Sequence, residues 1–135
     1  MKIADDIEML ELSVKNRPMI IHPIVIRDGD SYVLVDTGMP GHEEEIAALV
    51  RSAGIRAAKP GTIILTHQDI DHVGSLPHYK AGSGNKTEVI AHPDDRPYID
   101  GTLPLIKMNP DRLAAIVQSL TERQRVEFEA AFLNG

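Results

Sequence analysis

The segment Gly61–Thr66 constrains the fold of this chain more than any other. It reads Gly-Thr-Ile-Ile-Leu-Thr, a short apolar and β-branched run that is typical of a strand buried on both faces of a parallel sheet. Parallel strands need helical crossovers, so the chain is predicted to be α/β. The next residues, His67–Gly74, read His-Gln-Asp-Ile-Asp-His-Val-Gly and crowd two imidazoles and two carboxylates at the end of this strand.

Two sequence patterns upstream of Gly61–Thr66 predict a β-hairpin and a helix that can pack beside this strand. Met19–Ile26 and Ser31–Val35 are β-branched and apolar, and Asp28–Asp30 between them has turn chemistry, which predicts a β-hairpin. Three glutamates, Glu43–Glu45, suit the first turn of a helix. Apolar residues then recur at helical spacing until Gly54, which we expect to cap the helix.

The downstream half continues the α/β pattern. Thr87–Ala91 predicts another short strand, and Asp111–Leu120 and Thr121–Leu133 predict two amphipathic helices. Thr121, with Gln124 three residues later, resembles a capping box. The expected order is hairpin, helix, strand, helix, strand, helix, helix.

Length and composition limit the classes of function. With 135 residues, 42% of them hydrophobic, residues 1–135 are expected to form a single domain. We expect a cytoplasmic protein without membrane contact, because no apolar stretch nears the roughly 20 residues of a span and the start lacks a cationic leader. The net charge of −6 and the absence of a basic stripe argue against nucleic acid as a partner. There is no cysteine, so any metal must be held by imidazole and carboxylate.

The residues that follow Gly61–Thr66 have the spacing of metal ligands. In an extended segment His67 and Asp69 point the same way and can reach one ion. If the chain then bends into a helix, Asp71 and His72 can face a second position, about 3.5–4 Å from the first. The alternative is that these are solvated loop residues, with an aspartate capping a helix that begins near His72. The carboxyl end of a strand in an α/β sheet is the usual place for ligands, which favours the metal site.

The segment His67–His72 resembles the H-x-H-x-D-H signature of the metallo-β-lactamase superfamily. Val33–Gly38 looks like the other early motif of that superfamily, a strand that ends in Asp-Thr-Gly. The order of elements matches as well. The resemblance implies a metallo-β-lactamase-like αββα sandwich, truncated here to its N-terminal half, one β-sheet plus helices.

The resemblance also implies roles for individual residues. His67 and Asp69 would bind one metal ion, and Asp71 and His72 a second, with zinc as the expected divalent ion and iron or manganese as alternatives. Asp71 would act in catalysis by orienting the attacking water, a metal-bound hydroxide, toward a small-molecule lactone, thioester or other ester. Asp36 would accept a hydrogen bond behind the ligands, although it is equally suited to capping the turn that follows its strand.

Two departures from the family pattern keep other readings open. Asp69 stands where the family usually has histidine, and this harder ligand shifts the metal preference toward iron or manganese. An iron-dependent redox enzyme of the same fold is therefore an alternative.

The family supplies further ligands downstream of its signature, whereas His92 is the last histidine of this chain. We interpret His92 as structural or substrate-facing, His22 as a partly buried strand residue, and His42 and His78 as surface or helix residues. The chain alone is then a catalytically inactive fragment or associates with a second copy or a missing C-terminal half.

Overall fold

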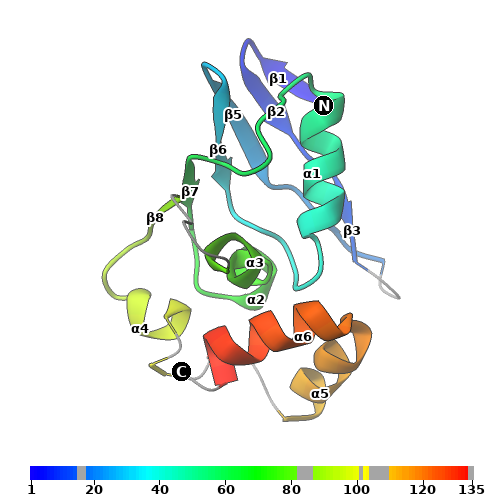
Figure 1. Cartoon of the computed structure of the whole chain (residues 1–135), viewed down its shortest axis with the longest axis vertical. Coiled ribbons are helices and arrows are strands. Elements are labelled where there is room, and N and C mark those ends of the chain that lie inside the picture. The colour runs from blue at the N-terminus through cyan, green and yellow to red at the C-terminus, as the bar shows by residue number, and fades with distance from the viewer. Residues whose placement is uncertain (15–17, 82–86, 101, 104–109, 134–135) are drawn as a thin grey trace.

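The computed structural model describes residues 1–14, 18–81, 87–100, 102–103 and 110–133. Six strands form one sheet in the order β1-β2-β5-β6-β7-β8, and β3 pairs with β4 in a small second sheet. Helix α1 lies against the large sheet, α2 and α3 lie at its lower end, and α5 and α6 lie beneath them (Figure 1). The strands are β1 Lys2–Ala4, β2 Ile7–Met9, β3 Leu12–Ser13, β4 Ile20–Ile21, β5 Ile24–Asp28, β6 Ser31–Val35, β7 Thr62–Ile64 and β8 Glu88–Ile90. The helices are α1 Glu43–Ser52, α2 Ile70–Val73, α3 Leu76–Lys80, α4 Arg96–Ile99, α5 Pro110–Ser119, α6 Glu122–Phe128 and a π-helical turn Glu129–Leu133.

The centre of the sheet follows the sequence prediction. Strands β5 and β6 form the expected antiparallel hairpin, closed where Asp28 pairs with Ser31 and Gly29 adopts a φ of 58°. Strand β7 pairs in parallel with β6 on one side and with β8 on the other. Helix α1 connects β6 to β7, so these elements form the predicted βαβ unit, and the α/β class is confirmed.

The prediction of one continuous strand over Met19–Ile26 is wrong. The structure divides it into β4, which pairs with β3, and β5, which pairs with β2 and β6. The break falls at Pro23, which has no N–H to donate to a strand ladder. Strands β1 to β3 and the short helices α3 and α4 were not anticipated, because segments of two to five residues carry little periodicity.

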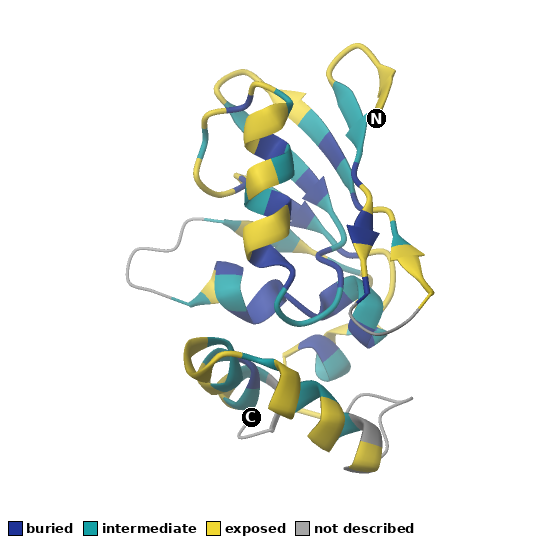
Figure 2. Cartoon of the chain, turned by 90° about the vertical axis from the view of Figure 1, so that its right-hand side faces the viewer, coloured by how far each residue is buried: buried dark blue, intermediate teal, exposed yellow. Residues whose placement is uncertain are grey.

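The core lies between the large sheet and α1. Along β6, Tyr32 and Leu34 are buried and face Ile46 and Val50 of α1, in one cluster with Ile63 of β7. The apolar stripe of α1 has the predicted helical spacing, and its exposed residues lie on the side away from the sheet (Figure 2).

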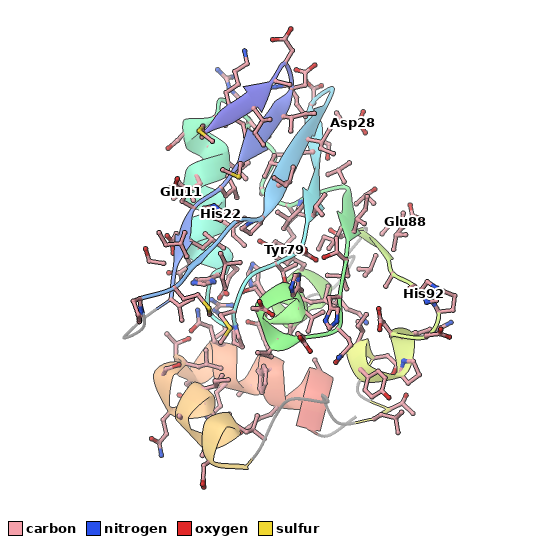
Figure 3. All side chains as sticks on the ribbon, turned by 180° about the vertical axis from the view of Figure 1, so that it is seen from behind. Glu11, His22, Asp28, Tyr79, Glu88 and His92 are labelled. Atoms are coloured by element: carbon pink, nitrogen blue, oxygen red, sulfur yellow. The ribbon has the colours of Figure 1, made fainter. Side chains whose placement is uncertain are left out.

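No helix in the part of the chain that the structure describes covers the opposite face of the sheet. The strand register places one set of apolar residues on this face, and each of them is half-buried or exposed. Figure 3 shows the sheet from this side, with α1 behind it. Strand β7 is therefore buried on one face, where Ile63 lies, and not on both as its sequence predicted. We call this set the open face: Ile7, Met9, Ile24, Ile26, Val33, Val35, Thr62, Ile64 and Ile90.

Helix α6 is tied to the rest of the fold by a buried carboxylate. Glu43, at the start of α1, accepts hydrogen bonds from Arg123 (2.9 Å) and Gln124 (2.7 Å) of α6. The predicted capping box is present, since Thr121 and Gln124 exchange both of its hydrogen bonds. Phe128 from the same helix is buried in the main core. The hydrogen bond between Arg123 and Glu43 joins residues about eighty positions apart in the chain.

Gly74 is the point of closest approach between α2 and the loop that follows β6. Its N–H donates to the carbonyl of Gly38 (2.9 Å), and a Cβ atom there would lie 2.3 Å from the backbone nitrogen of Pro40. Only glycine lets the two backbones meet this closely. None of the helices in the described ranges is long and apolar enough to cross a bilayer.

We predict that Gly74→Ala lowers the free energy of unfolding by about 3 kcal/mol, because backbone atoms of Met39 and Pro40 would have to move. Chemical denaturation of the two proteins measures the difference. Gly29→Ala is the control, since its Cβ would meet no atom within 4 Å and the cost there is the positive φ alone, about 1 kcal/mol. Equal losses in the two variants would contradict the steric explanation.

A second prediction concerns acid stability. Burial raises the pKa of Glu43, but hydrogen bonds from Gln124, its own backbone and Arg123 outweigh that effect, and its pKa is lowered from 4.5. A lowered pKa stabilises the fold above the unfolded value, and this stabilisation is lost as pH falls through the folded value. We expect Glu43→Gln to cost about 1–2 kcal/mol near neutral pH and to flatten the loss of stability below about pH 4.5.

Denaturation curves at several pH values test this expectation. The matched control is Glu44→Gln, whose side chain is 82% exposed, and which we expect to follow the unmodified chain. If both variants keep the full acid sensitivity, the buried pair does not cause it.

Candidate metal centre

The candidate ligands lie where β7 leaves the sheet. Asp69 is the N-cap residue of α2 in extended conformation (φ −63°, ψ 153°), so the chain bends into a helix directly after it. Asp71 and His72 lie in this short helix, as the sequence predicted for the second ligand pair. The neighbouring strand β6 ends at the same edge, where the N–H of Asp36 donates to the carbonyl of Ile64 (2.8 Å).

The four side chains form two close pairs. His67 Nδ1 lies 3.4 Å from Asp69 Oδ2, and His72 Nε2 lies 3.6 Å from Asp71 Oδ1. Two ligand atoms bound to one tetrahedral ion at about 2.0–2.1 Å are themselves about 3.3–3.4 Å apart. The rings of His67 and His72 have centroids 5.6 Å apart, so the two pairs are neighbours. Donor types suit a divalent ion at each pair, but the ligand spacing of the first pair is that of Nδ1 of His67, which already accepts from the N–H of Asp69.

The first pair would have to adjust its protons to bind through Nε2 of His67. The backbone N–H of Asp69 donates to His67 Nδ1 (3.0 Å), which places the proton of a neutral ring on Nε2. Coordination through Nε2 would move that proton to Nδ1 and break the contact.

The second pair is held by Asp36. Its carboxylate accepts from the N–H of Thr66 (2.8 Å), from the hydroxyl of Thr66 (2.6 Å) and from Nδ1 of His72 (2.9 Å). A carboxylate only accepts, so Nδ1 of His72 carries the proton and Nε2 keeps a lone pair on the side of Asp71. Asp36 itself has a φ of 66°, a conformation that costs roughly 1–2 kcal/mol for a non-glycine residue.

The backbone of α2 is fixed by residues that the sequence analysis did not select. The carbonyl of His72 accepts from the N–H (2.7 Å) and hydroxyl (3.0 Å) of Thr37, which is fully buried. Ser75, also buried, donates its hydroxyl to the carbonyl of Met39 (2.6 Å). The Asp-Thr-Gly motif contained the signal for Thr37, but nothing in the sequence pattern marks Ser75.

The remaining histidines lie apart from the two pairs or bond to the backbone. His22 is exposed at the break between β4 and β5, with its ring on the carbonyl of Leu10, rather than partly buried in a strand. His42 is buried, not a surface residue, because its ring accepts from the N–H of Met39 and contacts the carbonyl of Ser13. His92 is exposed beyond the end of β8 and accepts from the N–H of Asp94.

A third cluster lies at the docking site of α6. Among the described residues, Glu43, His78 and Glu127 offer three ligand atoms within 4.8 Å of one another, which the four signature residues do not. Arg123 already occupies this group: its guanidinium contacts Glu43, Glu127 and Nδ1 of His78 (3.0 Å). Because a fixed cation neutralises these carboxylates, we interpret the cluster as the ion-pair network that holds α6.

The chain resembles known proteins in sequence. The family model for the metallo-beta-lactamase superfamily matches residues 16–120. The probable metallo-hydrolase YybB of Bacillus subtilis (strain 168) is 32% identical over 106 residues, which cover 76% of this chain and 46% of that protein. The chain thus spans about half the length of this curated relative.

Solved structures agree with the fold. The metallo-beta-lactamase FIM-1 from Pseudomonas aeruginosa, in its mono-zinc form, aligns with a TM-score of 0.57 at 17% identity, over 72% of this chain and 43% of that one. A metallo-beta-lactamase from Hirschia baltica aligns with a TM-score of 0.56 at 23% identity, over 79% and 49%. These similarities confirm the predicted metallo-β-lactamase-like fold, and this chain corresponds to less than half of each of the two longer chains. The chain belongs to the metallo-beta-lactamase superfamily.

Proposed function

We propose that this chain contributes the metal-binding half of a metal-dependent hydrolase that acts on a lactone, a thioester or another ester. The arrangement of His67, Asp69, Asp71 and His72 carries the proposal, since two imidazole–carboxylate pairs at ligand spacing lie side by side at one edge of the sheet. His67 and Asp69 would hold one ion, and Asp71 and His72 another. The relative from Bacillus subtilis, a probable metallo-hydrolase, supports the same class of reaction.

Divalent ions would supply the chemistry that these side chains lack: when bound, they lower the pKa of water toward about 7 and polarise a carbonyl group. The protein's own contribution is orientation. Asp36 fixes the tautomer of His72 so that Nε2 presents its lone pair. Asp71, 38% exposed, is the carboxylate that can accept a proton from a water at the edge of the site and orient it toward a substrate.

Zinc is the expected metal, and the carboxylate of Asp69 favours iron or manganese as alternatives. The solved structure of FIM-1 holds one zinc ion, which is a property of that protein. The second candidate function, motivated by Asp69, is iron-dependent redox chemistry on the same fold. The two functions differ in the metal required and in the use of oxygen.

The expected outcome for the unmodified chain is metal-dependent hydrolysis of generic lactones and thioesters that is lost on chelation. Asp71→Asn should lower kcat by about 10²–10⁴-fold, because the amide cannot accept the proton of the attacking water. Asp94→Asn is the matched control, since its side chain is 92% exposed and its contact is with His92. Rates are measured after loading with Zn²⁺, Mn²⁺ or Fe²⁺.

Any other result of these rate measurements would favour one of the alternative functions or remove the role given to Asp71. Oxygen consumption with Fe²⁺ and no hydrolysis would favour the redox enzyme. Metal binding without turnover under any loading would make the chain alone a catalytically inactive fragment, and hydrolysis that survives Asp71→Asn would remove the role given to Asp71.

We also propose that the open face is covered in the working protein, by a second copy of this chain or by a segment that supplies the second half of the sandwich. Apart from Glu88 in the edge strand and Asp28 and Ser31 at the hairpin turn, this face presents aliphatic side chains and Thr62 on five adjacent strands. Contiguous exposed apolar surface of this kind marks an interface. Because the open face lies beside the candidate metal site, a chain or segment that covers it would lie close to the proposed substrate.

If a second copy is the cover, light scattering should give twice the chain mass of 14.8 kDa. Val33→Lys, at the middle of the open face, should then shift the protein to monomer because a charge would be buried in the interface. Val126→Lys is the matched control, since Val126 is 54% exposed on α6, away from the sheet. A monomer that is unaffected by Val33→Lys would exclude the second copy and leave the other cover.

A further inference from the structure

Gln68 is the residue between the two candidate ligands His67 and Asp69, and it points the other way. Gln68 as a residue is only 4% exposed, whereas the side chain of His67 is 48% exposed. Its amide nitrogen donates to Asp69 Oδ1 (3.1 Å). A buried amide thus contacts one oxygen of a carboxylate whose other oxygen, Oδ2, lies 3.4 Å from the ring of His67.

The direction of this amide is determined by its partner. Turning it by 180° would set Oε1 against Asp69 Oδ1, and two acceptors would face each other. In the observed orientation Oε1 is buried and has no hydrogen-bond partner among the described residues. An unsatisfied buried acceptor costs about 1–3 kcal/mol, so stability alone does not explain a glutamine at this position.

The hydrogen bond from Gln68 distinguishes the two carboxylate oxygens of Asp69. Either oxygen of a carboxylate can bind a metal, and rotation about the last side-chain bond exchanges them. A hydrogen bond from Gln68 to Oδ1 fixes the rotation and leaves Oδ2 on the side of His67. An imidazole ligand needs no such selection, because only one of its nitrogens faces the ion.

We propose that Gln68 is a positioning residue that selects Oδ2 of Asp69 as the metal-facing oxygen. This inference rests on the proposed function, in which His67 and Asp69 hold one ion. Gln68 acts through Asp69 and touches neither metal nor substrate. The buried Oε1, for which the described part of the chain offers no hydrogen-bond partner, is the cost in stability of this arrangement.

The test is the affinity of the full chain for Zn²⁺, measured by competition with a chromophoric chelator. Gln68→Leu keeps the side-chain volume and removes the donor, and should weaken binding about 10–100-fold, the usual effect of losing the partner of a ligand. The thermal stability of the metal-free variant should equal or exceed that of the unmodified chain, because the unsatisfied carbonyl is gone. Gln118→Leu, on the exposed side of α5, is the matched control and should change neither quantity.

A double-mutant cycle with Asp69→His separates positioning from packing. With an imidazole at position 69, Gln68→Leu should change zinc affinity by less than about twofold, since there is no carboxylate to orient. The visible spectrum of bound Co²⁺ gives a second readout, because it should change with Gln68→Leu only when Asp69 is present.

The outcomes distinguish this inference from the function it rests on. Failure of the unmodified chain to bind zinc or cobalt would overturn the proposed function, and the inference with it. Metal binding that is indifferent to Gln68→Leu, or that weakens equally in the Asp69→His background, would overturn the inference alone.

Discussion

The carboxylate of Asp36 is the interaction on which the site depends. It joins the ends of two parallel strands, through both hydrogen-bond donors of Thr66, and reaches the imidazole of His72 in the next helix. The parallel pairing of β6 with β7 brings their ends to the same edge, but the strand pairing alone would not orient a side chain there. The left-handed backbone of Asp36 is strain that this contact can offset, as is common at functional sites.

At the same edge of the sheet, both backbone packing and side-chain hydrogen bonds hold α2 in place. Gly74 lets α2 approach the loop after β6, and Thr37 then holds that helix by donating its N–H and its hydroxyl to the carbonyl of His72. The ligands are thus placed by two kinds of constraint, close packing of backbone and hydrogen bonds to a buried hydroxyl.

The sequence predicts correctly those elements that carry a local signal and are long enough to show a periodic pattern. The hairpin over β5 and β6, the helix after Glu43 and the capping box at Thr121 follow from turn residues, periodicity and caps. The strand before Arg27 breaks at Pro23, a local signal that the prediction of one continuous strand did not use, whereas its pairing with β2 and β3 depends on distant partners. Gln68 and Ser75 were missed for the same reason: their roles come from contacts made by folding, and their residue types carry no pattern.

The open face and the metal site meet on the same two strands. Val35 and Ile64 belong to the open face, and the next residues along their strands lead to Asp36 and His67 at the edge. Whatever covers the apolar face at this end therefore lies beside the ligand pairs. Burying the site behind such a cover would lower its dielectric and strengthen every charge–charge interaction within it. If the chain binds metal as proposed, covering the sheet and completing the environment of the ions are thus one requirement, imposed by the register of β6 against β7.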